Sequence, residues 1–132
     1  MQLASIRIIT DDLDSLVSFY EQLTGVTAER PAPPFAELVL PSATLAIGQS
    51  QTVALFGAGS ARADNHSVII EFRVDDVDDE YTRLKALVSE WVQGPTTMPW
   101  GNRSILFRDP DGNLVNLFAP VTEEAIQRFQ GR

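Results

Sequence analysis

The chain has 132 residues and a formal net charge of −8, from 18 Asp and Glu against 10 Lys and Arg. This acidic balance argues against a nucleic-acid partner, because proteins bind the phosphate backbone through a basic surface. The absence of cysteine excludes disulfides, thiolate metal sites and a cysteine nucleophile, and the single histidine excludes a multi-histidine metal site within one chain.

The first half of the sequence predicts a strand, a helix and three further strands. An apolar, β-rich run over Ser5–Ile9 is followed by apolar residues at helical spacing from Leu13 to Leu23. Gly25 then stands where a helix commonly ends in a left-handed residue. The further strands are expected at Val26–Arg30, Phe35–Leu40 and Thr44–Gly48, with prolines between them.

A small, polar segment at about residues 50–66 is expected to be a loop between the halves. The second half then repeats the first, with a strand at Val68–Arg73 and a helical pattern from Val77 to Leu87. Its further strands are expected at Ser89–Gln93, Ser104–Arg108 and Leu114–Phe118. The sequence DPDG over Asp109–Gly112 predicts a turn between the last two strands, and Thr122 is expected to cap a short helix over about residues 122–129.

An internal repeat supports this organisation. The sequence TDDLD at Thr10–Asp14 returns as VDDVD at Val74–Asp78, 64 residues later, and each copy lies between a strand and a helix. Asp12 and Asp76 are placed to accept hydrogen bonds from the first helical turn. The sequence therefore predicts one α+β domain over residues 1–132 with two βαβββ modules, at about residues 4–49 and 67–119, whose sheets enclose a cleft.

These motifs resemble the vicinal oxygen chelate superfamily of glyoxalases, bleomycin resistance proteins and ring-cleaving dioxygenases. The resemblance covers about residues 4–119 and rests on the two aspartate motifs, Phe19-Tyr20, Trp100-Gly101 and the sequence DPDGNL over Asp109–Leu114. It implies mixed sheets around a cleft and a homodimer. Pairing of the modules within one chain, or swapped between two chains, stays open.

The resemblance also implies where metal-dependent members hold their four metal ligands, which are usually His or Glu. The corresponding positions here are Ser5, Ala46, Ile69 and Asn116. Alanine and isoleucine cannot bind a metal through their side chains, and serine and asparagine are weak neutral donors. We therefore expect no metal and no other cofactor.

Arg7 and Glu71 are the charged candidates for ligand binding, together with Ser5 and Asn116. Strand alternation places Arg7 on the face of Ser5 and Glu71 on the face of Ile69, so that both project toward the predicted cleft. They either orient a polar ligand group, form a structural ion pair, or lie on a solvated rim. Trp100, in a loop before a strand, either stacks on a planar ligand or packs at the cleft mouth or a dimer interface.

Two functions from different classes are compatible with these residues. The first is a metal-free, homodimeric binding protein for a small, planar or cationic organic molecule, which a net negative charge would attract. The second is a lyase, isomerase or dioxygenase that uses a displaced metal site from Glu37, His66 and Glu71, or acid/base chemistry through Arg7 and Glu71. No targeting segment and no run of roughly 18 apolar residues is visible, so we expect a cytoplasmic protein without a membrane partner.

Overall fold

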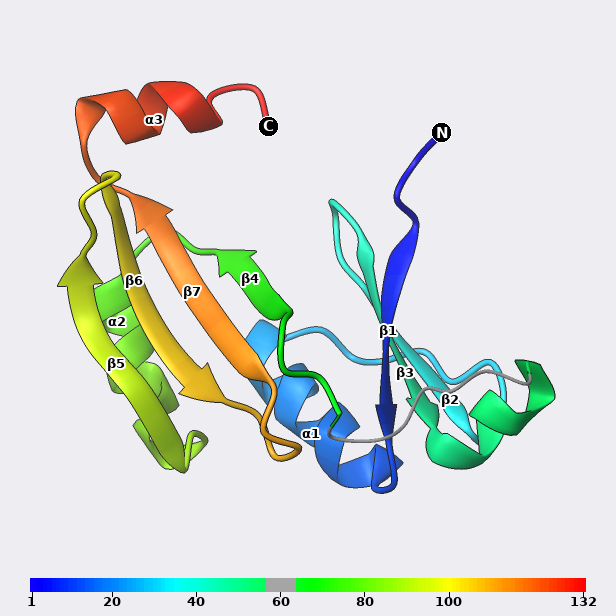
Figure 1. The fold of residues 1–132 in the computed structure, drawn as a ribbon. Coiled ribbons are helices and arrows are strands. Elements are labelled where there is room, and N and C mark those ends of the chain that lie inside the picture. Colours follow the sequence, from blue (N-terminus) through cyan, green and yellow to red (C-terminus); the bar gives the residue numbers. More distant parts are fainter. Residues whose placement is uncertain (57–63) are drawn as a thin grey trace. The chain divides into compact units, whose positions relative to one another are not determined.

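Two β-sheets, each packed against a helix of its own, make up the structure (Figure 1), a computed structural model that describes residues 1–56 and 64–132. They belong to two compact units. The first unit comprises Met1–His66 and Pro110–Gly112, and the second comprises Ser67–Asp109 and Asn113–Arg132. The mixed α+β architecture predicted from the repeat is confirmed.

The first unit contains β1 (Ser5–Thr10), α1 (Leu13–Thr24), β2 (Phe35–Val39) and β3 (Thr44–Gln49). Its sheet has the order β1-β3-β2, in which β1 runs parallel and β2 antiparallel to β3. The helix α1 packs on β2 and β3. On that face the sheet buries residues from both strands, namely Ala36, Leu38, Leu45 and Ile47.

The ends of α1 follow from local chemistry, as the sequence predicted. The Asp12 carboxylate accepts a hydrogen bond from the Ser15 amide at 3.1 Å, and this satisfies one of the free donors of the first turn. At the other end, Gly25 adopts a φ of 73° and its amide donates to the Glu21 carbonyl at 2.8 Å. Both predictions are confirmed.

The strand expected at Val26–Arg30 is wrong. That segment makes a single bridge, between Glu29 and Glu37. Two of its amides are taken by side chains instead of a neighbouring strand: Val26 donates to the Thr24 hydroxyl at 3.2 Å and Ala28 to the Glu21 carboxylate at 2.8 Å. Local acceptors of this kind compete with a strand ladder, so the described residues of the first unit form a sheet of three strands.

The loop expected at about residues 50–66 is corrected in its first part, which is a 3₁₀ helix over Ser50–Phe56. The buried Thr52 supports its start, because its hydroxyl donates to the Gln49 carbonyl at 2.7 Å. Residues 57–63 of the expected loop lie outside the described residues.

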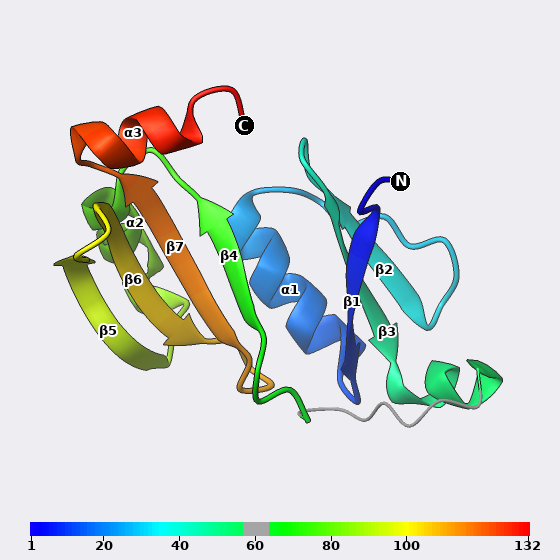
Figure 2. The same ribbon diagram turned by 45° about the horizontal axis from the view of Figure 1, so that its top comes forward.

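The second unit contains the four-stranded sheet β4-β7-β6-β5 and two helices (Figures 1 and 2). Strand β4 runs parallel to β7, and the other neighbours are antiparallel. The helix α2 contacts β5, β6 and β7 and lies behind them in Figure 1. The elements are β4 (Ile69–Arg73), α2 (Val77–Arg83) with a 3₁₀ turn (Leu84–Ala86), β5 (Glu90–Thr97), β6 (Asn102–Arg108), β7 (Leu114–Pro120) and α3 (Glu123–Phe129).

The predicted caps and turn of the second unit are confirmed. Asp76 accepts from the Asp79 amide at 3.0 Å and Thr122 from the Ala125 amide at 3.2 Å, so both residues cap their helices. Between β6 and β7, the Asp109 carboxylate accepts from the backbone and the side chain of Asn113, at 2.9 and 2.8 Å. Gly112 closes this turn with a φ of 86°.

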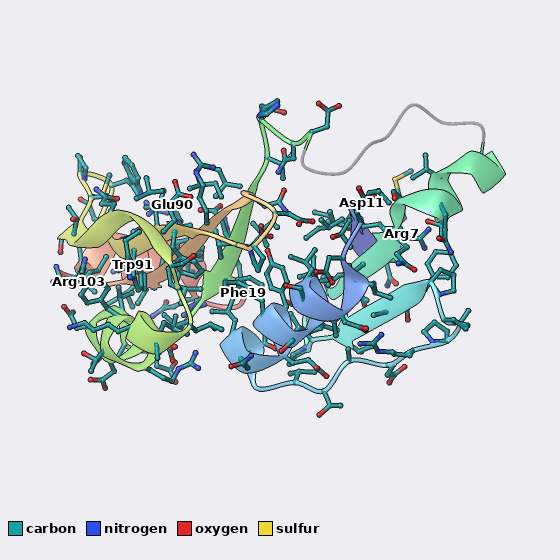
Figure 3. The ribbon with its side chains drawn as sticks, turned by 90° about the horizontal axis from the view of Figure 1, so that it is seen from below. Arg7, Asp11, Phe19, Glu90, Trp91 and Arg103 are labelled. Carbon is teal, nitrogen blue, oxygen red and sulfur yellow. The ribbon has the colours of Figure 1, made fainter. Side chains whose placement is uncertain are left out.

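A bidentate ion pair joins α2 to β6. The Arg103 guanidinium donates to the two Asp78 carboxylate oxygens at 2.7 and 2.9 Å, and Figure 3 labels this arginine. These hydrogen bonds hold the pKa of Asp78 below its ordinary value of 3.8. Because the pKa is lowered in the folded state, the resulting stabilisation is present above the unfolded pKa and is lost as pH falls through the folded pKa.

We expect the substitution R103Q to raise the pKa of Asp78 back toward its ordinary value. The glutamine amide is neutral and cannot reproduce the two charge-assisted hydrogen bonds of the guanidinium. Carboxyl ¹³C chemical shifts followed over an acid titration measure this change. R108Q is the control, since Arg108 lies on the same strand but pairs with Glu90 at 3.8 Å. An Asp78 pKa that moves equally in both variants would contradict the assignment.

Over residues 1–56 and 64–132, every helix falls short of the length and hydropathy that crossing a bilayer requires.

Candidate functional site

Three residues stand in one row across the sheet of the first unit, on the face opposite α1. Ala46 on β3 pairs with Arg7 on β1 and with Glu37 on β2. Side chains directly opposite one another in a sheet share a face, and the buried residues that alternate with this row face α1. The row therefore presents a cation and an anion on either side of a small apolar residue.

A cavity of about 200 Å³ opens over this row. Its lining joins two charged residues to apolar walls and consists of Arg7, Pro31, Phe35, Ala36, Glu37 and Ala46. The Arg7 guanidinium lies 5.0 Å from the centroid of the Phe35 ring, in a cation–π contact that orients it. Figure 3 labels Arg7 on the first unit.

Gly48 lies beside the contact between Arg7 and Phe35. A Cβ at position 48 would lie 3.4 Å from the Arg7 Cδ and 3.5 Å from the Phe35 Cδ1, and only 3.2 Å from the Thr52 hydroxyl oxygen. The last of these distances is tighter than ordinary van der Waals contact. An alanine at this position would therefore press on Thr52, and it would meet Arg7 and Phe35 only at ordinary van der Waals distance.

The charges of Arg7 and Glu37 are separated rather than paired. Neighbouring strands lie about 4.8 Å apart, so two strand spacings, about 10 Å, separate the two backbones. Within the residues that the structure describes, neither side chain takes part in an ion pair. Ser5 lies two residues before Arg7 on the same face, is exposed, and pairs with Thr44.

In the second unit, Glu71 and Asn116 meet on the sheet face opposite α2. They are direct partners on the parallel strands β4 and β7, and the Asn116 Nδ2 donates to the Glu71 Oε2 at 2.7 Å. The Asn116 Oδ1 is buried and has no hydrogen-bond partner among the described residues. Arg7 belongs to the other unit, and within their own units Arg7 contacts Phe35 and Glu71 contacts Asn116.

Trp100 does not reach the Glu71–Asn116 pair. It lies in the turn between β5 and β6, where Gly101 donates to the Met98 carbonyl at 2.9 Å, and its side chain is 55% exposed. Asn102, two residues after Trp100, has Pro120 as its strand partner, which lies four residues beyond Asn116 and therefore about 13 Å along the strand. The other tryptophan, Trp91 on β5, is half-buried, and its ring lies 5.4 Å from that of Phe107.

The residues of the expected alternative metal site do not form a cluster in either unit. His66 is 83% exposed, and its Nε2 lies 4.0 Å from the Asp64 carboxylate. Glu37 belongs to the first unit and Glu71 to the second. In neither unit do the described residues bring together three His, Cys, Asp or Glu side chains that could hold a metal ion.

The family model for the glyoxalase/bleomycin resistance protein/dioxygenase superfamily matches residues 2–117. The chain belongs to this superfamily. A glyoxalase/bleomycin resistance protein/dioxygenase from Nocardioides is 26% identical, with a TM-score of 0.79 over 93% of this chain and 85% of that one. No curated protein matches the chain.

Two further solved structures share the fold at lower identity. A glyoxalase-related enzyme from Fulvimarina pelagi is 20% identical with a TM-score of 0.78, over 90% of this chain and 88% of that one. A superfamily enzyme from Burkholderia phytofirmans PsJN is 19% identical with a TM-score of 0.76, over 92% of this chain and 100% of that one. At these identities the likeness concerns the fold alone.

The four positions where metal-dependent members hold their ligands differ in burial and in their neighbours. Ala46 is buried in the middle of its row and Ser5 is exposed at the start of β1. Ile69 is exposed on β4 beside Leu114. Asn116 has its amide nitrogen committed to Glu71.

Sequence reasoning missed Phe35 and Glu37 as neighbours of Arg7. The sequence-based prediction gives Phe35 only a place in a strand, and it gives Glu37 only a role in a displaced metal site. Their alternation with the apolar Ala36 and Leu38 was a usable signal that both face away from the helix. Their proximity to Arg7 depends on the pairing of both β1 and β2 with β3, which no local pattern specifies.

Proposed function

We propose that this chain is a metal-independent binding protein of the superfamily that holds a small planar organic ligand against β1, β3 and β2. The observation that supports this most directly is the cavity over the row of Arg7, Ala46 and Glu37. It combines apolar walls with a few charged groups, which is the usual composition of a small-molecule site. The expected homodimer and cytoplasmic location stay predictions.

The side chains at the superfamily's metal positions do not fit a divalent cation. Ala46 and Ile69 offer only hydrocarbon, and Ser5 offers one neutral hydroxyl. Asn116 already donates to Glu71, and its remaining oxygen is a single neutral donor. Zinc and harder divalent cations take imidazole, carboxylate or several oxygens in exchange for their water. This donor set supports binding rather than the metal-assisted chemistry of other members.

The size and charges of the cavity indicate the class of ligand. A cavity of about 150 Å³ is large enough for benzene, so the observed 200 Å³ suits a single planar ring with one substituent. Phe35 and Pro31 provide apolar surface for the ring. The Glu37 carboxylate would accept from a basic or donating substituent, and the Arg7 guanidinium would donate to an acceptor at the opposite edge. The net charge of −8 attracts cations over longer distances.

The proposal is tested by titrating single-ring cations, with benzamidine and 4-aminopyridine as probes, into ¹⁵N-labelled protein. We expect shifts of the Phe35, Glu37 and Ala46 amides, and roughly tenfold weaker binding in E37Q, because a charge-assisted hydrogen bond is lost. NMR is the suitable readout, since both tryptophans lie in the second unit.

E71Q is the matched control, because it removes the same charge from the second unit. Equal weakening in E37Q and E71Q would contradict a site at the cavity, as would a panel that leaves all three amides unshifted. Elemental analysis of protein purified without chelators tests the enzymatic alternative. Stoichiometric Zn, Ni, Fe or Mn would contradict metal independence.

A further inference from the structure

Three arginines of the second unit surround one aromatic ring. The guanidinium carbons of Arg73, Arg128 and Arg132 lie 5.6, 5.5 and 5.4 Å from the centroid of the Phe129 ring. Arg73 ends β4, Arg128 lies in the last turn of α3, and Arg132 follows that helix. We call these three residues the arginine triad. It gathers cations from two segments that are far apart in the sequence.

Backbone and ring contacts hold the arginine triad in place. The Phe129 ring packs at 5.4 Å on the Phe118 ring of β7, which fixes the end of α3 to the sheet. The Arg73 Nη1 donates to the Phe129 carbonyl at 3.3 Å, and the Arg128 Nη2 donates to the Trp100 carbonyl at 2.9 Å. A guanidinium has five N–H donors, so these single bonds orient the groups and leave most of their donors for another partner.

Among the described side chains, the arginine triad has no ion-pair partner, although the chain has more acidic than basic residues. Four other arginines pair with carboxylates: Arg30 with Asp14, Arg83 with Glu80, Arg103 with Asp78 and Arg108 with Glu90. Arg7 instead contacts the Phe35 ring. Within the part of the chain that the structure describes, no carboxylate forms an ion pair with the triad. Three like charges around one ring repel one another, and an anion placed among them would relieve that repulsion.

We propose that the arginine triad, supported by Phe129, binds the oxyanion of a small soluble ligand, either a phosphate group or a carboxylate. Guanidinium groups match both oxyanions because their planar fork donates two parallel hydrogen bonds. Three guanidinium charges favour the more highly charged anion, so affinity rises from carboxylate to phosphate to pyrophosphate. This site uses other residues than the cavity of the first unit, and each proposal stands or fails separately.

The experiment is calorimetric titration of the full chain with acetate, inorganic phosphate and pyrophosphate at constant ionic strength. We expect binding in that order of increasing affinity. The triple variant R73Q/R128Q/R132Q should bind pyrophosphate roughly tenfold more weakly or worse, since it loses charge-assisted hydrogen bonds. The single variant R132Q alters only an exposed residue beyond α3, so it preserves the fold, and it should weaken binding by a smaller factor.

The matched control is R30Q/R83Q/R108Q, which makes the same change in net charge at arginines that have carboxylate partners. Its pyrophosphate affinity should stay close to that of the unsubstituted chain. Equal weakening in the two triple variants would overturn the site, because it would show attraction by net charge alone. Absence of binding by all three anions would also overturn it.

A phosphate group can also belong to a lipid headgroup. A second experiment therefore distinguishes a lipid headgroup from a free phosphate compound. The chain is sedimented with phosphatidylcholine vesicles that contain phosphatidylglycerol. We expect the chain to stay in the supernatant while free pyrophosphate binds. Sedimentation with these vesicles without binding of free phosphate or pyrophosphate would overturn the assignment to a small soluble ligand.

Discussion

Replacing Gly101 with alanine is expected to lower the free energy of unfolding by about 2–4 kcal/mol. Gly101 has a φ of 92°, and a Cβ there would lie 2.0 Å from the Thr122 hydroxyl oxygen and 3.0 Å from the Ala125 Cβ. That hydroxyl caps α3 by accepting from the Ala125 amide. The added methyl group must therefore both strain the turn and displace the cap.

Gly112 provides the matched control for this prediction. Its φ of 86° imposes a similar backbone strain, but a Cβ at Gly112 would have no heavy atom within 4 Å. G112A should therefore lower the free energy of unfolding by only about 1–2 kcal/mol, which is the cost of the left-handed conformation alone. Urea denaturation of both variants measures the difference. Equal losses would show that the contact of Gly101 with Thr122 and Ala125 has no energetic weight.

Truncating Phe107 to alanine is expected to lower the free energy of unfolding by about 3–5 kcal/mol, because it removes a large side chain from a closely packed core. Phe107 is 0% exposed. Its ring lies 5.4 Å from the Trp91 ring, which in turn lies 4.7 Å from the Tyr81 ring of α2. Denaturation followed by tryptophan fluorescence should show both the lower midpoint and an altered native signal.

Leu106 is the neighbouring control for Phe107. It points to the other face of the sheet and is half-buried, so L106A shortens an apolar side chain, by fewer carbons than F107A, without opening the core beneath α2. We expect L106A to lower the free energy of unfolding by clearly less than F107A does. A loss in L106A as large as that in F107A would contradict the assignment of the core to the face that α2 covers.

Local chemistry made much of the fold predictable. Asp12, Asp76 and Thr122 each cap a helix in the expected way, because a short polar side chain before an apolar periodic run has few other acceptable roles. Gly25 and Gly112 take positive φ where the sequence required a left-handed residue. These features depend on a few consecutive residues, so one sequence suffices to find them.

Features that depend on strand pairing were harder to predict. The partner of Glu71 is Asn116, which the sequence treated as a separate candidate, because the two meet only through the β4–β7 register. The strand expected at Val26–Arg30 failed because the side chains of Glu21 and Thr24 take its amides. A β-rich composition does not reveal such competition. The cavity at Arg7 likewise needed the order β1-β3-β2.

The length of α3 has a consequence for local unfolding. A helix of seven residues is too short to persist by itself in water. Its first turn depends on the β5–β6 turn, because the Gly101 carbonyl accepts from the amides of Val121 and Thr122 at 2.9 and 3.3 Å. Helix and turn therefore open together as one cooperative element, and amide hydrogen exchange in α3 reports the opening free energy of the turn that holds it.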